Sequence, residues 1–113
     1  MKKLIYVMFA VFTVTIVQAQ EKKDKNAKHE IEVKGNCEMC EKRIEKAAYS
    51  VKGVKSAEWH AEHKDLHLII DERKCSIDDV HKAVAESGHD TDKIKAAAED
   101  YNSLHGCCKY ERE

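Results

Sequence analysis

The chain has 113 residues, which is the length of one compact domain. It carries 20 basic and 21 acidic side chains, for a formal net charge of −1. This near-neutral balance gives no electrostatic case for binding nucleic acid or an anionic membrane surface, and we expect neither as a partner.

Residues 1–19 have the layout of a secretory signal peptide. Lys2 and Lys3 form a positive n-region, residues 4–17 are almost all apolar, and Ala19 is a small residue suited to cleavage. The apolar run is shorter than the about 20 residues that a membrane-spanning helix needs, which disfavours the alternative of a retained anchor. We therefore expect a periplasmic or secreted protein that has no membrane contact after cleavage.

The next segments alternate between strand and helix patterns. Residues 20–28 are mostly charged and predict a solvated linker. Ile31 and Val33 alternate with charged residues, which predicts a strand from residue 29. Apolar residues at helical spacing then predict a helix over residues 38–51, followed by a C-cap glycine at residue 53.

The second half of the pattern predicts a hairpin and another helix. Residues 54–61 and 66–70 alternate apolar and polar side chains on either side of a turn. Ser76 and Asp79 form a variant of the capping box at the start of a helix that ends at Gly88. The order strand, helix, strand, strand, helix predicts an α+β sandwich, with both helices on one face of an antiparallel sheet.

The C-terminal part does not show a clear final strand. Residues 90–104 have apolar side chains at helical spacing and an alanine triplet, so we expect a third helix there. A tail containing Cys107 and Cys108 follows it. The chain thus divides into a signal peptide (1–19), a linker (20–28), a domain (29–90) and a C-terminal helix with its tail (91–113).

Cys37 and Cys40 form a Cys-x-x-Cys pair at the start of the first predicted helix. The free N–H groups and the positive end of the helix dipole favour thiolates there. Two thiolates without other obvious ligands suit Cu(I) and similarly soft ions, whereas a four-cysteine zinc site would need a second pair. The rivals are a structural disulfide and a thiol–disulfide oxidoreductase, and the chain has no proline such as a thioredoxin-like site ordinarily carries.

Residues 29–90 resemble a heavy-metal-associated domain. The residues from Gly35 to Cys40 match the metal loop of that family, Gly53-Val54 its helix-to-strand junction, and Gly88-His89 its glycine–aromatic corner. The resemblance implies a ferredoxin-like βαββαβ fold, with the last strand replaced here by the C-terminal helix and tail. It also implies that Cys37 and Cys40 hold the metal, which passes to a partner by ligand exchange.

Three features depart from the family pattern. The loop is one residue shorter than usual, and Met39, between the cysteines, is interpreted as packing rather than as a thioether ligand. His89 stands in place of the usual corner residue. It could be a third ligand to the metal, a donor that orients a ligand, or simply an exposed side chain. Cys107 and Cys108 are hypothesised to fold back as extra sulfur ligands; the alternatives are a second weak site, an intermolecular contact or a disulfide with Cys75.

Scattered histidines offer no comparable pattern. His60 and His63 flank the hairpin turn, where a weak Cu(II) or Zn(II) site is conceivable, but a solvated turn is the favoured interpretation.

These observations predict a metal-binding protein rather than an enzyme, because no nucleophile–base pair, carboxylate dyad or phosphate loop occurs. We expect a copper chaperone or scavenger that binds Cu(I), with Hg(II), Ag(I) and Zn(II) as other candidate ions. Its expected partner is a metal-transporting ATPase or an efflux component. The alternatives are a periplasmic mercury-binding protein and a thiol–disulfide oxidoreductase, or a domain that senses metal without moving it.

Overall fold

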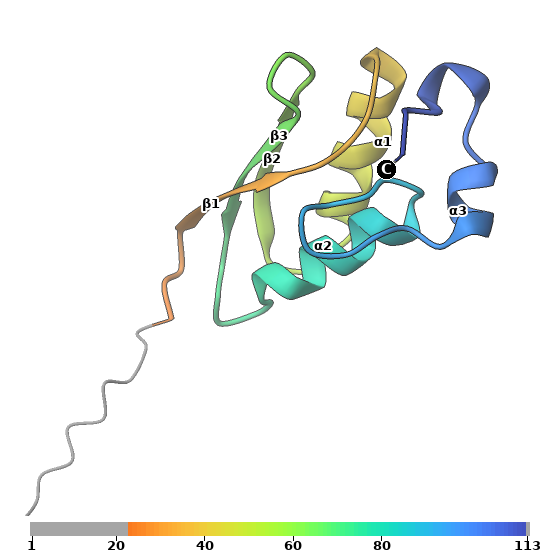
Figure 1. Ribbon diagram of the computed structural model, residues 1–113. Coiled ribbons are helices and arrows are strands. Elements are labelled where there is room, and N and C mark those ends of the chain that lie inside the picture. The colour runs from red at the N-terminus through yellow and green to blue at the C-terminus, as the bar shows by residue number, and fades with distance from the viewer. Residues whose placement is uncertain (1–22, 113) are drawn as a thin grey trace, which may run out of the picture.

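The computed structural model describes residues 23–112, so the expected signal peptide lies outside the described residues. Three strands, two long helices and two short C-terminal helices follow one another along the chain (Figure 1). In order they are β1 (Ala27–Glu32), α1 (Glu38–Tyr49), β2 (Val54–His60), β3 (Asp65–Ile70), α2 (Ile77–Glu86), α3 (Ala98–Asn102) and the 3₁₀ helix η2 (Gly106–Cys108). The first strand starts at Ala27, so the last two residues of the expected linker pair with β3.

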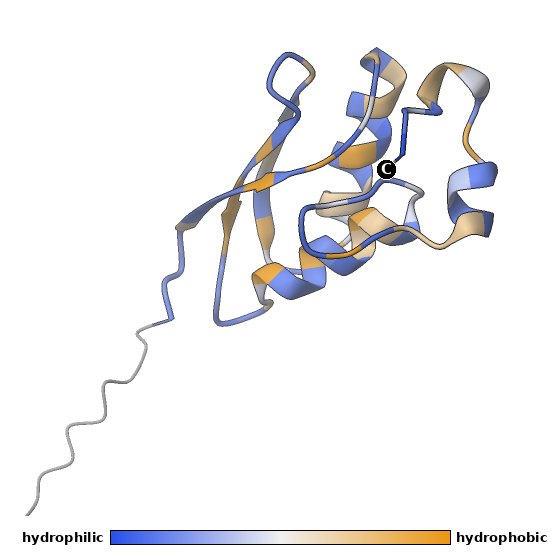
Figure 2. Ribbon diagram, in the orientation of Figure 1, coloured by the Kyte–Doolittle hydropathy of each residue, from blue (hydrophilic) through white to orange (hydrophobic). Residues whose placement is uncertain are grey.

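The three strands form one antiparallel sheet in the order β1-β3-β2. Alternate side chains of each strand face α1 and α2, which lie together on one side of the sheet (Figure 1). Figure 2 shows the resulting alternation of apolar and polar positions along the strands. The expected α+β sandwich is confirmed, with a core that contains Ile31, Ile44, Trp59, Leu66, Leu68, Ile70, Val80 and Val84.

The second long helix begins as the sequence predicts. Ser76 Oγ accepts a hydrogen bond from the backbone N–H of Asp79, and Asp79 Oδ2 accepts one from the backbone N–H of Ser76. This reciprocal capping satisfies two N–H groups that have no partner within the helix. Gly88 follows the helix with φ of +105°, in the left-handed region that glycine adopts most readily.

In place of the fourth strand of a ferredoxin-like sheet, the structure has a single antiparallel bridge between Val33 and Thr91. The backbone N–H of Lys34 donates to the Asp90 carbonyl, and that of Asp92 donates to the Glu32 carbonyl. Thr91 Oγ1 then accepts hydrogen bonds from the N–H groups of the two residues that follow Asp92, which turns the chain away from the sheet.

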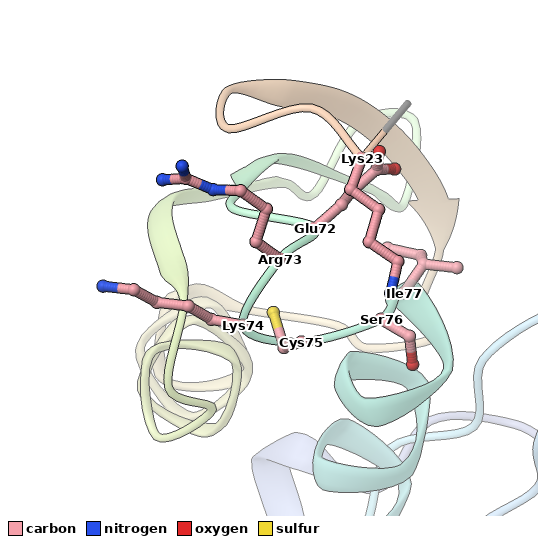
Figure 3. A pocket seen from close by; sticks show the side chains of 7 residues that line it. All are labelled: Lys23, Glu72, Arg73, Lys74, Cys75, Ser76 and Ile77. Atoms are coloured by element: carbon pink, nitrogen blue, oxygen red, sulfur yellow. The ribbon is translucent and has the colours of Figure 1, made fainter. Parts of the chain in front are cut away.

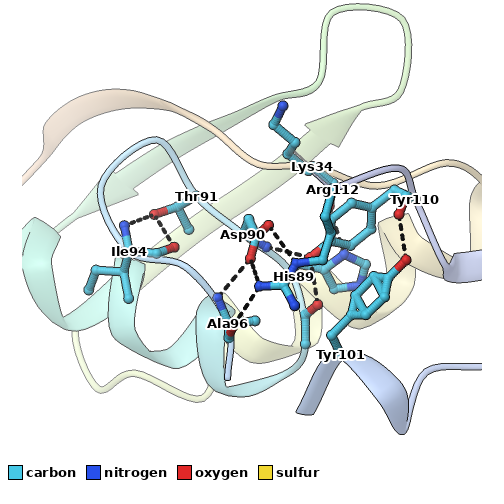
Figure 4. Close-up of polar contacts among 10 residues, drawn as sticks. Lys34, His89, Asp90, Thr91, Ile94, Ala96, Tyr101, Tyr110 and Arg112 are labelled. Atoms are coloured by element: carbon cyan, nitrogen blue, oxygen red, sulfur yellow. Dashed lines mark hydrogen bonds and ion pairs between the residues drawn. The ribbon is translucent and has the colours of Figure 1, made fainter. Parts of the chain in front are cut away.

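The helix expected over residues 90–104 is wrong for most of that range, since only Ala98–Asn102 are helical. Side chains bind the preceding backbone, which is not helical: Asp90 Oδ1 accepts the N–H of Ala96, and Arg112 donates to the Ala96 carbonyl (Figure 4). These tertiary bonds use backbone groups that a helix would have paired internally. Within residues 23–112, no helix is long and apolar enough to cross a membrane.

Candidate metal centre

The Cys-x-x-Cys pair lies where β1 gives way to α1. Cys37 is the N-cap of α1, with an extended backbone, and Cys40 lies in the first helical turn. The Cys37 thiol is partly exposed, whereas Cys40 is fully buried against the core. Their sulfurs are 3.7 Å apart. The pair therefore presents one accessible and one enclosed sulfur at the same helix start.

Backbone N–H groups prepare Cys37 to bind as a thiolate. The N–H of Cys40, with a smaller contribution from that of Met39, lowers the pKa of the Cys37 thiol to about 7. This is the stabilisation expected for an anion at a helix N-terminus. The backbone N–H of Asn36 in turn lies 3.3 Å from Cys40 Sγ and donates to it. Both sulfurs thus accept hydrogen bonds from backbone N–H groups at the helix start.

The C-terminal tail brings a third sulfur to this pair. Cys108 Sγ lies 4.0 Å from Cys37 Sγ, and ligand atoms of Cys37, Cys40 and Cys108 all lie within 4.8 Å of one another. With metal–sulfur bonds of about 2.3 Å, three sulfurs around one ion in a trigonal arrangement are about 4.0 Å from one another. Two sulfurs on opposite sides of an ion, in a linear arrangement, are about 4.6 Å apart. The observed spacings therefore suit a three-sulfur site.

Cys108 differs from Cys37 in its protonation. Its side chain is fully buried, and this burial raises the pKa of the thiol well above its ordinary value, as do the neighbouring cysteines. Cys108 is accordingly a neutral thiol at neutral pH. A bound cation would displace its proton, as cations do from the thiol ligands of metal sites.

Polar contacts beyond Cys108 hold the tail in place (Figure 4). The Tyr110 hydroxyl donates to the Gly88 carbonyl and accepts from the backbone N–H of Asp90, both at 2.8 Å. The Arg112 guanidinium binds both carboxylate oxygens of Asp90, at 2.9 and 3.1 Å. These residues fasten the tail to the corner after α2 and so keep Cys108 against Cys37 and Cys40.

Two other candidates do not join the sulfur cluster. Cys107 is exposed, and its thiol points at Met39 Sδ, 3.5 Å away. His89 is fully buried rather than exposed: its Nδ1 is 2.8 Å from the Lys34 carbonyl, and its ring stacks on Tyr110. His89 Nε2 is buried and has no hydrogen-bond partner among the described residues. In this conformation His89 supports the tail.

Cys75 lies at the other end of α1. Its sulfur is packed near Gly53, which follows the C-terminus of α1, whereas Cys37 precedes the N-terminus. A helix of 12 residues is about 18 Å long, too far for one ion to bridge. Cys75 lines a separate hollow (Figure 3) with Lys23, Glu72, Arg73, Lys74, Ser76 and Ile77. Burial raises the pKa of its thiol, as expected for an unreactive cysteine.

The sequence pattern missed several residues that shape the loop. Lys64 Nζ donates to the Gly35 carbonyl at 3.0 Å, which brings a positive charge to the loop. A Cβ on Gly35 would lie 3.1 Å from Cys40 Cβ and 3.2 Å from the Trp59 ring, so a larger residue would require these side chains to shift by a few tenths of an ångström. The ion pair of Asp90 and Arg112, which anchors the tail, could not be predicted from a local pattern because the two residues are 22 positions apart.

Solved structures share this architecture. The match with the CopZ metallochaperone has a TM-score of 0.56 at 24% identity, over 57% of this chain and 98% of that one. The N-terminal domain of a potential copper-translocating P-type ATPase from Bacillus subtilis, in the Cu(I)-loaded state, matches with a TM-score of 0.56 at 25% identity. The match covers 58% of this chain and 84% of that one. The chain has the fold of a heavy-metal-associated domain.

A further match with that fold is oxidised MerP from Ralstonia metallidurans CH34, with a TM-score of 0.50 at 24% identity, over 57% of this chain and 94% of that one. No family model and no curated protein sequence matches the chain. The heavy-metal-associated fold accounts for the sheet, α1 and α2. Beyond the single bridge at Thr91, the segment that leads to Cys108 takes the place of its fourth strand.

Proposed function

We propose that the protein binds one soft metal ion, Cu(I) in the first place, through the thiolates of Cys37 and Cys40 with Cys108 as a third sulfur. The gathering of these three sulfurs within 4.8 Å carries the proposal. Thiolates prefer soft cations, and Cu(I) accepts low coordination numbers. The protein then acts as an exported, non-enzymatic chaperone or scavenger, with the ion as its cargo.

Transfer to a partner would proceed by exchange of sulfur ligands. Cys40 and Cys108 are buried, whereas Cys37 is partly exposed, so an incoming thiolate meets the ion from the side of Cys37. The partner's sulfur binds before Cys37 leaves, which keeps the ion coordinated throughout. A metal-transporting ATPase or an efflux component that carries its own cysteines is the expected acceptor, since the N-terminal domain of a potential copper-translocating P-type ATPase has the same fold.

Hg(II) is the second candidate cargo, because the same sulfur ligands suit it and MerP shares the fold. Elemental analysis of protein purified anaerobically after growth in copper, mercury, silver or zinc would identify the ion. We expect one copper per chain and loss of that copper in the Cys37→Ser/Cys40→Ser variant. Protein that carries no soft metal under any of these conditions would contradict the proposal.

Redox catalysis is the alternative function that one observation favours. Cys37 combines a pKa of about 7 with a second sulfur 3.7 Å away, as an attacking thiol needs. The third sulfur and the absence of proline from the sequence favour metal binding instead. An insulin-reduction assay separates the two functions, since only an oxidoreductase would turn over with a thiol reductant.

A further inference from the structure

The face of the sheet turned away from α1 and α2 carries a second group of metal-binding side chains. In the described chain no helix covers this face (Figure 1). The strand register places Glu30 of β1 and Glu58 of β2 opposite His67 of the central strand β3. It also places His60 opposite Asp65 at the same end of the sheet. Three strands thus direct two histidines and three carboxylates to one place.

The polar atoms of this group lie close to one another. His67 Nε2 is 3.0 Å from Asp65 Oδ2, and His67 Nδ1 is 3.7 Å from Glu30 Oε2. One ligand atom from each of these three residues lies within 4.8 Å of the others. The His60 ring meets the His67 ring edge-on, with centroids 4.9 Å apart, and both line a shallow groove of about 360 Å³.

The charges on this face call for a cation. Three ion pairs here join a histidine to a carboxylate: His67 to Glu30 and Asp65, and His60 to Glu58. While the histidines are neutral, three negative charges therefore lie close together. Glu32 stands directly opposite Asp65 in the register, and like charges in that position destabilise a sheet.

Asp65, whose side chain is 25% exposed, leaves one of its carboxylate oxygens unpaired in the described chain. Its Oδ1 is buried and has no hydrogen-bond partner among the described residues. Buried acceptors are nearly always satisfied by a donor, a water or an ion. This atom adjoins the same histidine whose nitrogens face Asp65 and Glu30.

We propose that this outer face binds one divalent ion of the Zn(II) class between His67 Nε2 and Asp65, with His60 beside it and Glu30 on the other nitrogen of His67. Imidazole and carboxylate are ligands that Zn(II) accepts, whereas Cu(I) prefers the thiolates on the helix-covered side. When one nitrogen of His67 holds the ion, a carboxylate on the other nitrogen orients the ring, as is usual for metal-binding histidines. The protein would then hold two metals of different chemistry on opposite sides of its sheet.

Zinc titration of the purified protein, with its thiolates first filled by one equivalent of Ag(I), tests this proposal. We expect Zn(II) to shift the ring resonances of His60 and His67 in NMR spectra. His67→Ala should weaken Zn(II) binding at least about tenfold because a ligand is lost, and Glu30→Gln should weaken it less because only the carboxylate that orients the ring is lost. Both positions are exposed, so the variants should fold, as circular dichroism will verify.

His63→Ala is the matched control. His63 is an exposed histidine in the turn between β2 and β3, outside the group described above. Its removal should leave the Zn(II) affinity within about twofold of the original, since exposed histidines outside a site contribute little. Equal Zn(II) binding by the original protein and the His67→Ala variant, or ring shifts at His63 alone, would overturn the proposal.

Discussion

Cys108 Sγ lies 4.0 Å from Cys37 Sγ, although 71 positions of the chain separate the two residues. Closing so long a loop costs conformational entropy, which the contacts of Tyr110 and Arg112 offset. The third sulfur is therefore a product of the tail's own anchoring.

Replacing Cys108 by serine should weaken soft-metal binding without unfolding the protein. Serine keeps the approximate size of the side chain but offers no soft ligand. We expect Cu(I) affinity to fall at least about tenfold, and X-ray absorption to report two sulfur ligands in place of three. Cys107→Ser is the matched control, because the Cys107 thiol faces Met39 and should be dispensable. Equal losses in the two variants would contradict the role of Cys108.

Removing the anchor of the tail should expose Cys108. Arg112→Ala leaves the Asp90 carboxylate, whose side chain is 6% exposed, without its charged partner. We expect a loss of about 1–3 kcal/mol in the free energy of unfolding and faster alkylation of Cys108. Mass spectrometry of the alkylated protein measures the second effect.

Arg73→Ala is the control for this experiment. Arg73 binds both carboxylate oxygens of Asp71 in the same fork geometry, but in the turn before α2, remote from the tail. Its loss should destabilise the fold while alkylation of Cys108 stays slow under native conditions. If both arginine variants accelerate alkylation alike, global unfolding rather than release of the tail is responsible.

The capping box of α2 should affect stability and leave the metal centre intact. Ser76→Ala removes the side-chain acceptor for the N–H of Asp79, which should lower the free energy of unfolding by about 1 kcal/mol. Urea denaturation measures this change, and Cu(I) affinity should not move. Ser103→Ala, an exposed hydroxyl bonded to the Glu99 carbonyl, should have a smaller effect. A matching loss in both variants would argue against specific capping.

Acid should destabilise the fold through its buried histidines. Burial lowers the pKa of His89 below its ordinary value of 6.5, so the folded state holds the ring neutral. The contribution of His89 to the free energy of unfolding is complete above pH 6.5. It is lost as the pH falls, because the unfolded chain takes up the proton, and the free energy of unfolding then drops by at most about 1.4 kcal/mol per pH unit. His81, also buried with a lowered pKa, adds in the same direction.

Thermal unfolding between pH 7.5 and pH 5 measures this effect. The His89→Phe variant keeps an aromatic ring for stacking on Tyr110 but cannot be protonated, so its melting temperature should fall less on acidification. The exposed His63→Ala variant should follow the original protein. An unchanged pH dependence in His89→Phe would assign the acid sensitivity to other groups.

Local patterns predicted the parts of the fold in which neighbours along the chain decide the conformation. The alternation around Ile31 and Val33, the helical spacing that includes Ile44, and the Ser76 cap each correspond to an element of the structure. The pattern over residues 90–104 misled, because Asp90 and Arg112 bind backbone groups there that a helix would need. Helix propensity is a weak preference, and such tertiary contacts override it.

The sequence by itself determined the helix start with Cys37 and Cys40, because a thiolate pair at that spacing depends only on local backbone geometry. Only the tertiary structure decided which distant side chains join it. Cys108 arrives through contacts between the tail and the corner after α2, whereas Cys107, its neighbour, faces the other way. Similarly, His67 meets Glu30 only because strand pairing aligns β1 with β3. Long-range pairing is set by packing of the whole chain, which no local pattern encodes.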